Sequence, residues 1–600
     1  MDLYLLHAPS VWDFRQRAVM FGPISDVIPS SSAFDMYPVG FTSIADYLEN
    51  HGHRVQIVNL AQRMLADPSY DGEAEIARLR APLVGIDLHW LPHAHGCLEV
   101  ARLVKRYHPR TKVLLGGLSA SYYHEELIQR PEVDLVLRGD STEEPMAQLL
   151  NALEKDATDL SHVPNLTWKD HSGAVQVNPL GWVPEDLDQV QLPGYRYVVR
   201  SVLRYRRLRN FIPYKGWLEY PNTALLTVRG CTQNCLLCGG SASAYNRICN
   251  RQRPAFRSPE ALREDIRFIR QFSRAPIFVI GDIRQAGDVY AGRLLDYIRQ
   301  DAVPNEMVFE LFGPADASFF QALNRSCARY SLEMTLESHE EAIRRRNGKF
   351  AVANGEVERT IRAALQNGCG RLDIFFMTGL PGQTPASALA TADYCRHLLE
   401  QNGGDRRLSF FLAPLAPFLD PGSRAFEDPG RYGYRLMWRT LEEHRQALLA
   451  PSWQYMLNYE TQDMDRRQIV AATYQAAARL NDLKGEFGLV APEVHAAVSR
   501  RIAQAQAVLE EISRIQEMPD ADRRQAALGA LRERMARLNK DTLCTYDELK
   551  WPARKHFASP LALARLGVSL LGDALRIGPA ALHRSLEAWR PAPGHSSADR

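Results

Sequence analysis

The sequence predicts an α/β fold class in three parts: an N-terminal doubly wound, Rossmann-like parallel sheet, then a partial (β/α)6 TIM-like barrel, and an α-helical C-terminal region. Three observations lead to this prediction. Strand and helix patterns alternate over residues 1–150, the alternation returns from Thr223 to about Pro421, and the pattern beyond Pro429 is helical. A chain of 600 residues also favours several domains over one.

The N-terminal domain, residues 1–150, is predicted from short apolar runs separated by amphipathic stretches such as Phe41–Asn50 and Gly96–Tyr107. This order of elements is typical of a parallel sheet covered by helices on both faces. The expected strands are Leu3–Leu6, Arg54–Val58, Leu83–Asp87, Lys112–Leu115 and Val133–Leu137.

Four further segments follow. Residues 151–220 are turn-rich and predict a short hairpin followed by an irregular linker. Residues 221–425 predict the barrel, residues 426–590 a helical domain with a helical hairpin broken at Pro519, and residues 591–600 a disordered tail. The expected barrel strands are Ala224–Val228, Ile277–Ile280, Met307–Leu311, Ser331–Leu336, Arg371–Met377 and Leu408–Leu412.

Composition excludes several classes of protein. The hydrophobic fraction of 46% and charged fraction of 24% are those of a soluble globular protein, and a net charge of +2 argues against a general nucleic-acid binder. We find no secretory signal and no apolar span of membrane length, and the nine cysteines are mostly scattered. We therefore expect a cytoplasmic protein without a disulfide framework.

Three cysteines carry the strongest chemical signal. Cys231, Cys235 and Cys238 form a C-x3-C-x2-C pattern, which offers three thiolates to a four-iron [4Fe-4S] cluster and leaves one iron open. Tetrathiolate zinc sites and ordinary ferredoxin clusters need a fourth cysteine in a related spacing, and Cys249 follows eleven residues later without a partner. A structural zinc knuckle is the alternative interpretation.

The cysteine loop resembles that of the radical S-adenosylmethionine (SAM) enzymes, and the resemblance implies that SAM binds the open iron. By the same resemblance, three strand ends contribute to SAM binding, because parallel barrels place their ligands at the carboxyl ends of strands. The residues implied are Leu237 in the loop, Gly281 and Asp282 after the second strand, Glu337 and Ser338 after the fourth, and Gly379 and Pro381 after the fifth. Leu237 departs from the family, which usually has an aromatic residue there.

The N-terminal domain lacks a dinucleotide-binding G-x-G-x-x-G turn after its first strand. Its motifs, from Tyr37-Pro-Val-Gly40 to Arg138-Gly-Asp-Ser-Thr-Glu143, resemble instead a cobalamin-binding domain, in which a glycine pair makes room for the cofactor's tail. No D-x-H-x-x-G string follows the first strand, so we expect no histidine ligand to cobalt. The resemblance implies cobalamin contacts from His89, Trp90, Gly116, Gly117, Ser119 and Gly139.

The two resemblances together identify the chain as similar to B12-binding domain/radical SAM domain proteins, the cobalamin-dependent radical SAM superfamily. The implied cofactors are a [4Fe-4S] cluster, SAM and cobalamin, and the implied activity is C-methylation of an unactivated carbon by way of a 5'-deoxyadenosyl radical. Cobalamin-assisted radical cyclisation or oxidation without methyl transfer is one alternative, and a non-catalytic redox or ligand-sensing module is another.

The partners we expect are a small-molecule or lipid-like substrate and an external electron donor of flavodoxin or ferredoxin type, with no nucleic acid. One segment, Leu561–Leu582, has a wide apolar helical face and is followed by Arg584, Trp589 and Arg590. Such a helix is able to lie in a membrane interface, although docking on its own domain is the commoner role. The expected location is therefore cytoplasmic, with membrane-peripheral contact as a further hypothesis.

Overall fold

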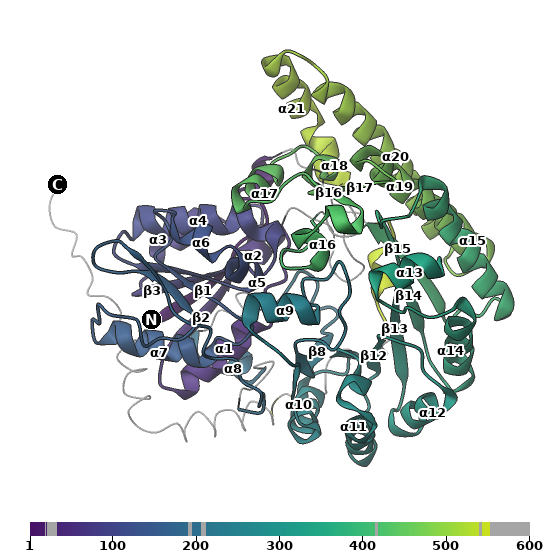
Figure 1. Ribbon diagram of the computed structural model, residues 1–600, viewed down its shortest axis with the longest axis horizontal. Coiled ribbons are helices and arrows are strands. Elements are labelled where there is room, and N and C mark those ends of the chain that lie inside the picture. The colour runs from purple at the N-terminus through teal and green to yellow at the C-terminus, as the bar shows by residue number, and fades with distance from the viewer. Residues whose placement is uncertain are drawn as a thin grey trace.

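Two α/β units lie side by side, and a helical region extends from the second (Figure 1). The computed structural model describes residues 1–17, 20, 33–189, 195–205, 212–414, 418–538, 543–551 and 564. The expected interfacial segment Leu561–Leu582 lies outside these ranges apart from residue 564, and so do Arg584, Trp589 and Arg590. Among the described residues, no helix combines the length and the apolar character needed to cross a membrane.

The N-terminal unit is built on a seven-stranded sheet in the order β2-β1-β3-β4-β5-β6-β7. Strands β1 to β5 pair in parallel, and β6 and β7 are antiparallel additions at one edge. The chain order reverses between β1 and β3, which is where doubly wound sheets bind their ligands. The strands are β1 (Leu3–His7), β2 (Val55–Asn59), β3 (Leu83–Asp87), β4 (Lys112–Gly116), β5 (Leu135–Leu137), β6 (Leu166–Lys169) and β7 (Val175–Val177).

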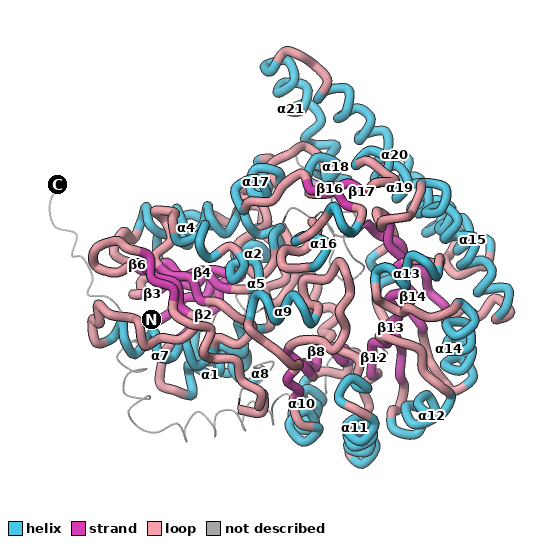
Figure 2. The backbone as a smooth tube through the Cα atoms, in the orientation of Figure 1, coloured by secondary structure: helices cyan, strands magenta, loops and turns pink. Residues whose placement is uncertain are grey.

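Helices cover both faces of this sheet, which buries its largely apolar strands (Figure 2). One layer holds α1 (Gly40–Asn50), α7 (Glu143–Glu154) and α8 (Tyr195–Tyr205), and the other holds α3 (Gly72–Arg78), α4 (Ala94–Tyr107) and α6 (His124–Ile128). Two shorter helices, α2 (Leu60–Ala66) and α5 (Leu118–Tyr122), follow β2 and β4.

The segment after residue 150 differs from its prediction in part. The expected hairpin is present as β6 and β7, but it extends the N-terminal sheet. Where an irregular linker was expected, α8 docks on α1, because Arg200 pairs with Asp46 at 2.6 Å and Arg204 with Glu49 at 2.8 Å.

The second unit contains six parallel strands in the order β15-β14-β13-β12-β11-β8, each in the region predicted from the sequence. They are β8 (Thr223–Leu226), β11 (Ile277–Ile280), β12 (Met307–Leu311), β13 (Tyr330–Glu337), β14 (Leu372–Thr378) and β15 (Leu408–Pro414). Helices α10 (Pro259–Phe272), α11 (Asp288–Gln300), α12 (Ala317–Ser326), α14 (Asn354–Gln366) and α15 (Pro385–Gln401) line the outside (Figure 1). The sheet is open between β8 and β15, so it is a partial barrel.

The described part of the C-terminal region is mainly helical, as predicted, and it also contains an antiparallel pair that the sequence did not indicate, β16 (Tyr434–Leu436) with β17 (Tyr459–Thr461). Helix α19 (Arg466–Glu486) packs on α15 and β15 and so completes the second unit. The predicted hairpin is α20 (Pro492–Gln516) with α21 (Ala521–Leu538), and its spaced residues Ile502, Leu509 and Ile512 are buried. Shorter helices are α16 (Arg424–Glu427), α17 (Leu441–Ala447) and α18 (Trp453–Met456).

Candidate functional site

The loop that carries the three cysteines follows a two-residue strand, β9 (Val228–Arg229), at the mouth of the barrel. All three thiols are free. Cys231 Sγ accepts a hydrogen bond from the Gln233 amide at 3.3 Å, and Cys238 Sγ accepts one from the Gly240 amide at 3.2 Å. Amide hydrogen bonds to sulfur are among the protein's means of tuning an iron–sulfur cluster, so the donor set fits the predicted [4Fe-4S] group.

A half-buried cation, Lys349, lies close enough to the cysteines to act on their charge. Burial raises the pKa of Cys235 to about 11 and that of Cys238 to about 12, and Lys349 partly opposes both shifts. The thiols are therefore protonated at neutral pH until a metal centre displaces the protons. Lys349 follows a short helix, α13 (Glu341–Asn347), and the sequence analysis did not identify it because no motif surrounds it.

A second residue that the sequence analysis missed, Asp420, joins the cysteine loop to the N-terminal unit. Its carboxylate accepts from the Gly239 amide at 3.1 Å and from Trp90 Nε1 at 3.1 Å. A Cβ on Gly239 would lie 2.6 Å from the Cβ of Asp420, so only glycine permits this approach. The cysteine loop is thus packed against the loop that follows β3.

Glu337 is the predicted SAM residue whose environment is most unusual. It ends β13 at a register shift against β14 and has a φ of 65°, which is rare for a residue with a side chain. Its Oε2 atom is buried without a hydrogen-bond partner among the described residues. Burial raises the pKa of Glu337 to about 7, opposed in part by Lys349. A buried acceptor of this kind beside a cation fits a polar ligand such as SAM.

Gly281 and Asp282 follow β11 as predicted, but they have different roles in the turn. The Gly281 amide donates to Glu310 at 2.5 Å. Its φ is 89°, and a Cβ there would lie 2.9 Å from Val228, so this position requires glycine. The Asp282 carboxylate pairs with Arg284 at 2.5 Å and accepts from the Phe312 amide at 2.9 Å. The side chain of Asp282 therefore holds the turn in place.

Ser338 and the turn after β14 are also engaged within the protein. Ser338 Oγ accepts from the Glu340 amide at 3.1 Å. Gly379 has a φ of 85°, and a Cβ there would lie 2.8 Å from the hydroxyl of Tyr459. Pro381 approaches Gly433, and Leu237 is only 3% exposed, in the hydrophobic cluster that includes Leu380.

A cavity of about 370 Å³ lies between the two units, over the carboxyl ends of the N-terminal strands. Of the predicted cobalamin residues, His89, Gly116, Gly117 and Gly139 line it, whereas Trp90 and Ser119 are not among its lining residues. The deeper walls are apolar and come from the sheet and from α1, including Leu5, Gly85, Leu114, Leu137, Phe41 and Ile44. A largely apolar cavity of this kind fits the tail of a cobalamin.

The two glycines after β4 serve different purposes. A Cβ on Gly116 would meet only the Leu137 carbonyl oxygen, at 3.6 Å, so this glycine does leave room in the cavity. A Cβ on Gly117 would lie 2.4 Å from the Cα of His89, and its φ is 115°. The expectation that both glycines clear a channel therefore needs correction for Gly117, which is required by the close approach of the β3 loop.

Charged residues from both units close the cavity. Arg229, just before the cysteine loop, pairs with Glu143 at 2.5 Å, and Ser43 donates to the same carboxylate at 2.6 Å. Although burial opposes its ionisation, Arg229 holds the pKa of Glu143 below its usual value. Arg251 pairs with Asp140 next to this site. These long-range partners carry no local sequence signal.

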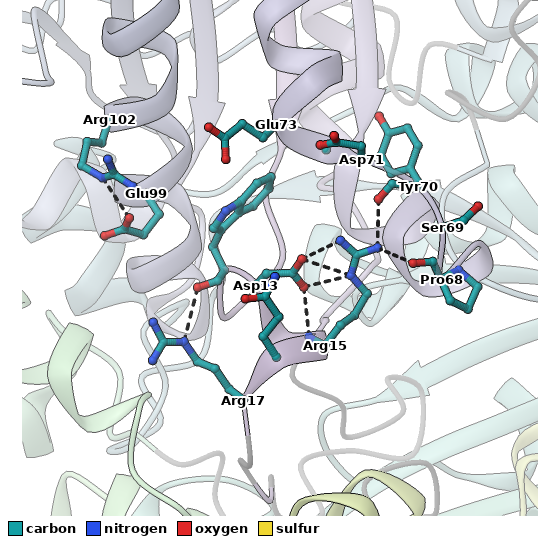
Figure 3. Close-up of a pocket in the computed structure, with 13 residues that line it drawn as sticks. Asp13, Arg15, Arg17, Pro68, Ser69, Tyr70, Asp71, Glu73, Glu99 and Arg102 are labelled. Atoms are coloured by element: carbon teal, nitrogen blue, oxygen red, sulfur yellow. Dashed lines mark hydrogen bonds and ion pairs between the residues drawn. The ribbon is translucent and has the colours of Figure 1, made fainter. Parts of the chain in front are cut away.

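A second hollow lies beside α3 and α4 of the N-terminal unit, around Asp13 and Arg15 (Figure 3). Arg15 donates to Asp13 and to the carbonyl oxygens of Pro68 and Tyr70, and Arg102 donates to Glu99 at 3.0 Å. The guanidinium groups in this hollow already donate to neighbouring oxygens. The hollow is therefore a weaker candidate for a ligand site than the cavity between the units.

One part of the chain matches a known domain family. Residues 26–149 match the B12 binding domain family. Hopanoid C-3 methylase of Methylococcus capsulatus is 27% identical over 248 residues, which cover 41% of this chain and 42% of that protein. Cytidylyl-2-hydroxyethylphosphonate methyltransferase of Streptomyces wedmorensis is 22% identical over 259 residues, which cover 37% and 47%. The chain thus spans less than half the length of either relative.

Solved structures share the fold over most of the chain. The radical SAM methyltransferase TsrM from Kitasatospora setae aligns with a TM-score of 0.54 at 15% identity, over 82% of this chain and 90% of that one. The cobalamin-dependent SAM radical enzyme OxsB aligns with a TM-score of 0.53 at 13% identity, over 98% and 83%. The fold class predicted from the sequence is therefore confirmed.

Proposed function

We propose, from the premise that the chain joins a B12-binding domain to the barrel fold of the cobalamin-dependent radical SAM enzymes, that it methylates an unactivated carbon. When bound, the cluster and cobalamin supply the reductive cleavage of SAM to a 5'-deoxyadenosyl radical and the transfer of a methyl group. The observation that carries the proposal is the junction at Asp420, where one carboxylate binds the cysteine loop and the loop that borders the cobalamin cavity.

Each cofactor has residues of this chain to receive it. Cys231, Cys235 and Cys238 would hold the cluster, and the buried Glu337 and half-buried Lys349 offer an acceptor and a cation to the polar end of SAM. The cavity between the units would take cobalamin, with Gly116 giving room for its tail. Its walls come from both units, which limits the access of water to the space between the cofactors.

Methyl transfer is favoured over the other outcomes by the names of the relatives. Both curated relatives are named as a methylase or a methyltransferase, and TsrM is named as a methyltransferase. Their named substrates differ widely, from a hopanoid to a cytidylyl phosphonate, so they favour a small molecule without defining it. We propose a small-molecule substrate, lipid-like or not, and an external electron donor of flavodoxin or ferredoxin type.

The first test is whether the cysteine loop supports reductive cleavage of SAM. Anaerobically reconstituted protein should form 5'-deoxyadenosine with a strong reductant, and Cys235→Ala should abolish this product because one of three cluster ligands is lost. Cys327→Ala is the matched control, since Cys327 is a buried thiol on the outer side of the barrel. Retention of 5'-deoxyadenosine formation by Cys235→Ala would falsify the cluster assignment.

The second test separates methyl transfer from cyclisation or oxidation. Cobalamin-loaded protein is incubated with SAM carrying a deuterated methyl group and with fractionated lipid, peptide and nucleotide extracts. Methyl transfer predicts a product that gains the labelled methyl group. A product that loses hydrogen without gaining the label would contradict methylation while leaving radical chemistry intact.

A further inference from the structure

Three histidines surround one buried aspartate at the floor of the cavity between the units. Asp87, the last residue of β3, accepts from His7 Nδ1 at 3.0 Å and from His89 Nδ1 at 2.7 Å. His93 lies near both rings at tilted angles, with centroids 4.8 Å from His7 and 4.9 Å from His89. The aspartate and His7 are fully enclosed, whereas the side chain of His89 is 30% exposed.

The hydrogen bonds show which ring nitrogens of His7 and His89 are donors. His7 donates from Nε2 to the Phe34 carbonyl oxygen at 2.8 Å and from Nδ1 to Asp87, so both of its nitrogens carry protons. A carboxylate only accepts, so His89 also donates to it from Nδ1. Neutral His89 is left with its lone pair on Nε2.

The free nitrogen of His89 faces the cavity. His89 lines the cavity beside Gly116 and Gly117, and because its Nδ1 edge is held against buried Asp87, the exposed edge of the ring carries Nε2. The backbone of His89 is fixed by close contact with Gly117 on one side. On the other side the next residue, Trp90, is bonded to Asp420.

An ordinary divalent-metal site is a weaker explanation of this cluster. His7, Asp87 and His93 have potential ligand atoms within 4.8 Å of one another. However, both ring nitrogens of His7 are committed as donors, so His7 has no lone pair to offer. His93 is buried and its Nδ1 contacts the Ala8 carbonyl oxygen at 3.1 Å, so it does not line the cavity.

A histidine that binds a metal through one nitrogen usually donates from the other to a carboxylate, which fixes the ring and raises its basicity. His89 has this arrangement in a cavity that fits cobalamin. We infer that His89 supplies an axial nitrogen ligand to the cobalt of cobalamin bound here, with Asp87 and His7 as positioning residues behind it. This inference rests on the proposed function, and it reverses the expectation of no histidine ligand, which considered only the motif that follows the first strand.

The test is the electron paramagnetic resonance spectrum of the full-length protein loaded with cob(II)alamin. An axial nitrogen splits each cobalt line into a triplet, and [15N]histidine should convert the triplets to doublets. His89→Ala and His89→Gln should lose the splitting, whereas His93→Ala, which changes a neighbouring ring, should keep it. Asp87→Asn should reduce the nitrogen coupling, a spectroscopic change that a purely structural role would not produce.

The possible outcomes of this experiment contradict either the ligand assignment or the proposed function. Bound cobalamin without nitrogen splitting, or with triplets unchanged by [15N]histidine, would overturn the ligand assignment, since the second result identifies the cofactor's own base. Doublets that persist in both His89 variants would also overturn it, because another histidine would then be the ligand. If the wild-type protein takes up no cobalamin, the proposed function fails and not only this inference. The labelled wild-type spectrum needs no variant, so it decides whether a histidine binds the cobalt even if one His89 variant misfolds, and the other His89 variant then decides which histidine.

Discussion

Asp420 is the residue through which the two halves of the candidate site touch. Its short side chain accepts from a main-chain amide of the cysteine loop and from an indole of the N-terminal unit. Burial raises its pKa, and the two donors partly oppose that shift. Removing the carboxylate would leave two donors unsatisfied, which costs more than the net value of the bonds themselves.

We therefore predict that Asp420→Ala lowers the stability of the protein by roughly 2–4 kcal/mol, seen as a lower midpoint of thermal unfolding. Asp420→Asn should cost less, because its amide oxygen still accepts one hydrogen bond. Asp428→Ala, at an exposed position in the same segment, is the control and should leave the midpoint nearly unchanged. Equal midpoints for wild type and Asp420→Ala would show that this junction contributes nothing to stability.

Elements with a strong local pattern were predictable from the sequence. The six barrel strands and five N-terminal strands are apolar runs bounded by turn residues, and the structure contains each of them. Helix α8 was not predicted, because its arginines bind Asp46 and Glu49, which lie more than 140 residues earlier in the chain. The β16 and β17 strands have three residues each and are separated by two helices, so no local turn indicates their pairing.

The residues of the candidate site also include some that the sequence could predict and some that it could not. Cys231, Cys235 and Cys238 could be identified by their spacing in one loop, whereas Lys349 and Asp420 are single residues from distant turns. Their importance comes from burial beside that loop, which no short sequence window records. Trp90 illustrates the opposite limit. Its place directly after His89, behind the third strand, suggested a cofactor contact, but its indole donates to Asp420.

In the loop after β4, the close packing of Gly117 leads to a prediction about the stability of the protein. Gly117→Ala should destabilise the protein by roughly 2–4 kcal/mol, because the new Cβ would lie 2.4 Å from the Cα of His89 and the backbone has a positive φ. Gly40→Ala is a matched control in the same cavity, since a Cβ there has no atom within 4 Å.

The measurement is the midpoint of thermal unfolding of each variant without added cofactors. A Gly117→Ala protein as stable as Gly40→Ala would mean that the β3 loop moves aside at little cost. In that case the effect of a larger residue at position 117 would have to come from filling the cavity.

At the scale of the whole molecule, the Arg229–Glu143 ion pair is one of the contacts that connect the barrel to the N-terminal unit beside the cavity. We predict that Glu143→Gln and Arg229→Met each destabilise the protein by about 3–5 kcal/mol, because each leaves a buried charge without its partner. The double variant should lose clearly less than the sum of the two single losses. Thermal unfolding of all four proteins gives the coupling, and strictly additive losses would contradict an energetic link between the units at this pair.

The shared walls of the cavity also have a consequence for how the protein is made in the cell. An occupant contacts the N-terminal sheet and the barrel together only after the two units have docked, and the docked state is held closed by buried charges. We therefore expect a large cofactor to enter most readily while the two units are docking or when their contact is loosened. The yield of active protein should accordingly follow the supply of that cofactor during synthesis, and protein purified empty should fill slowly unless the units are first loosened.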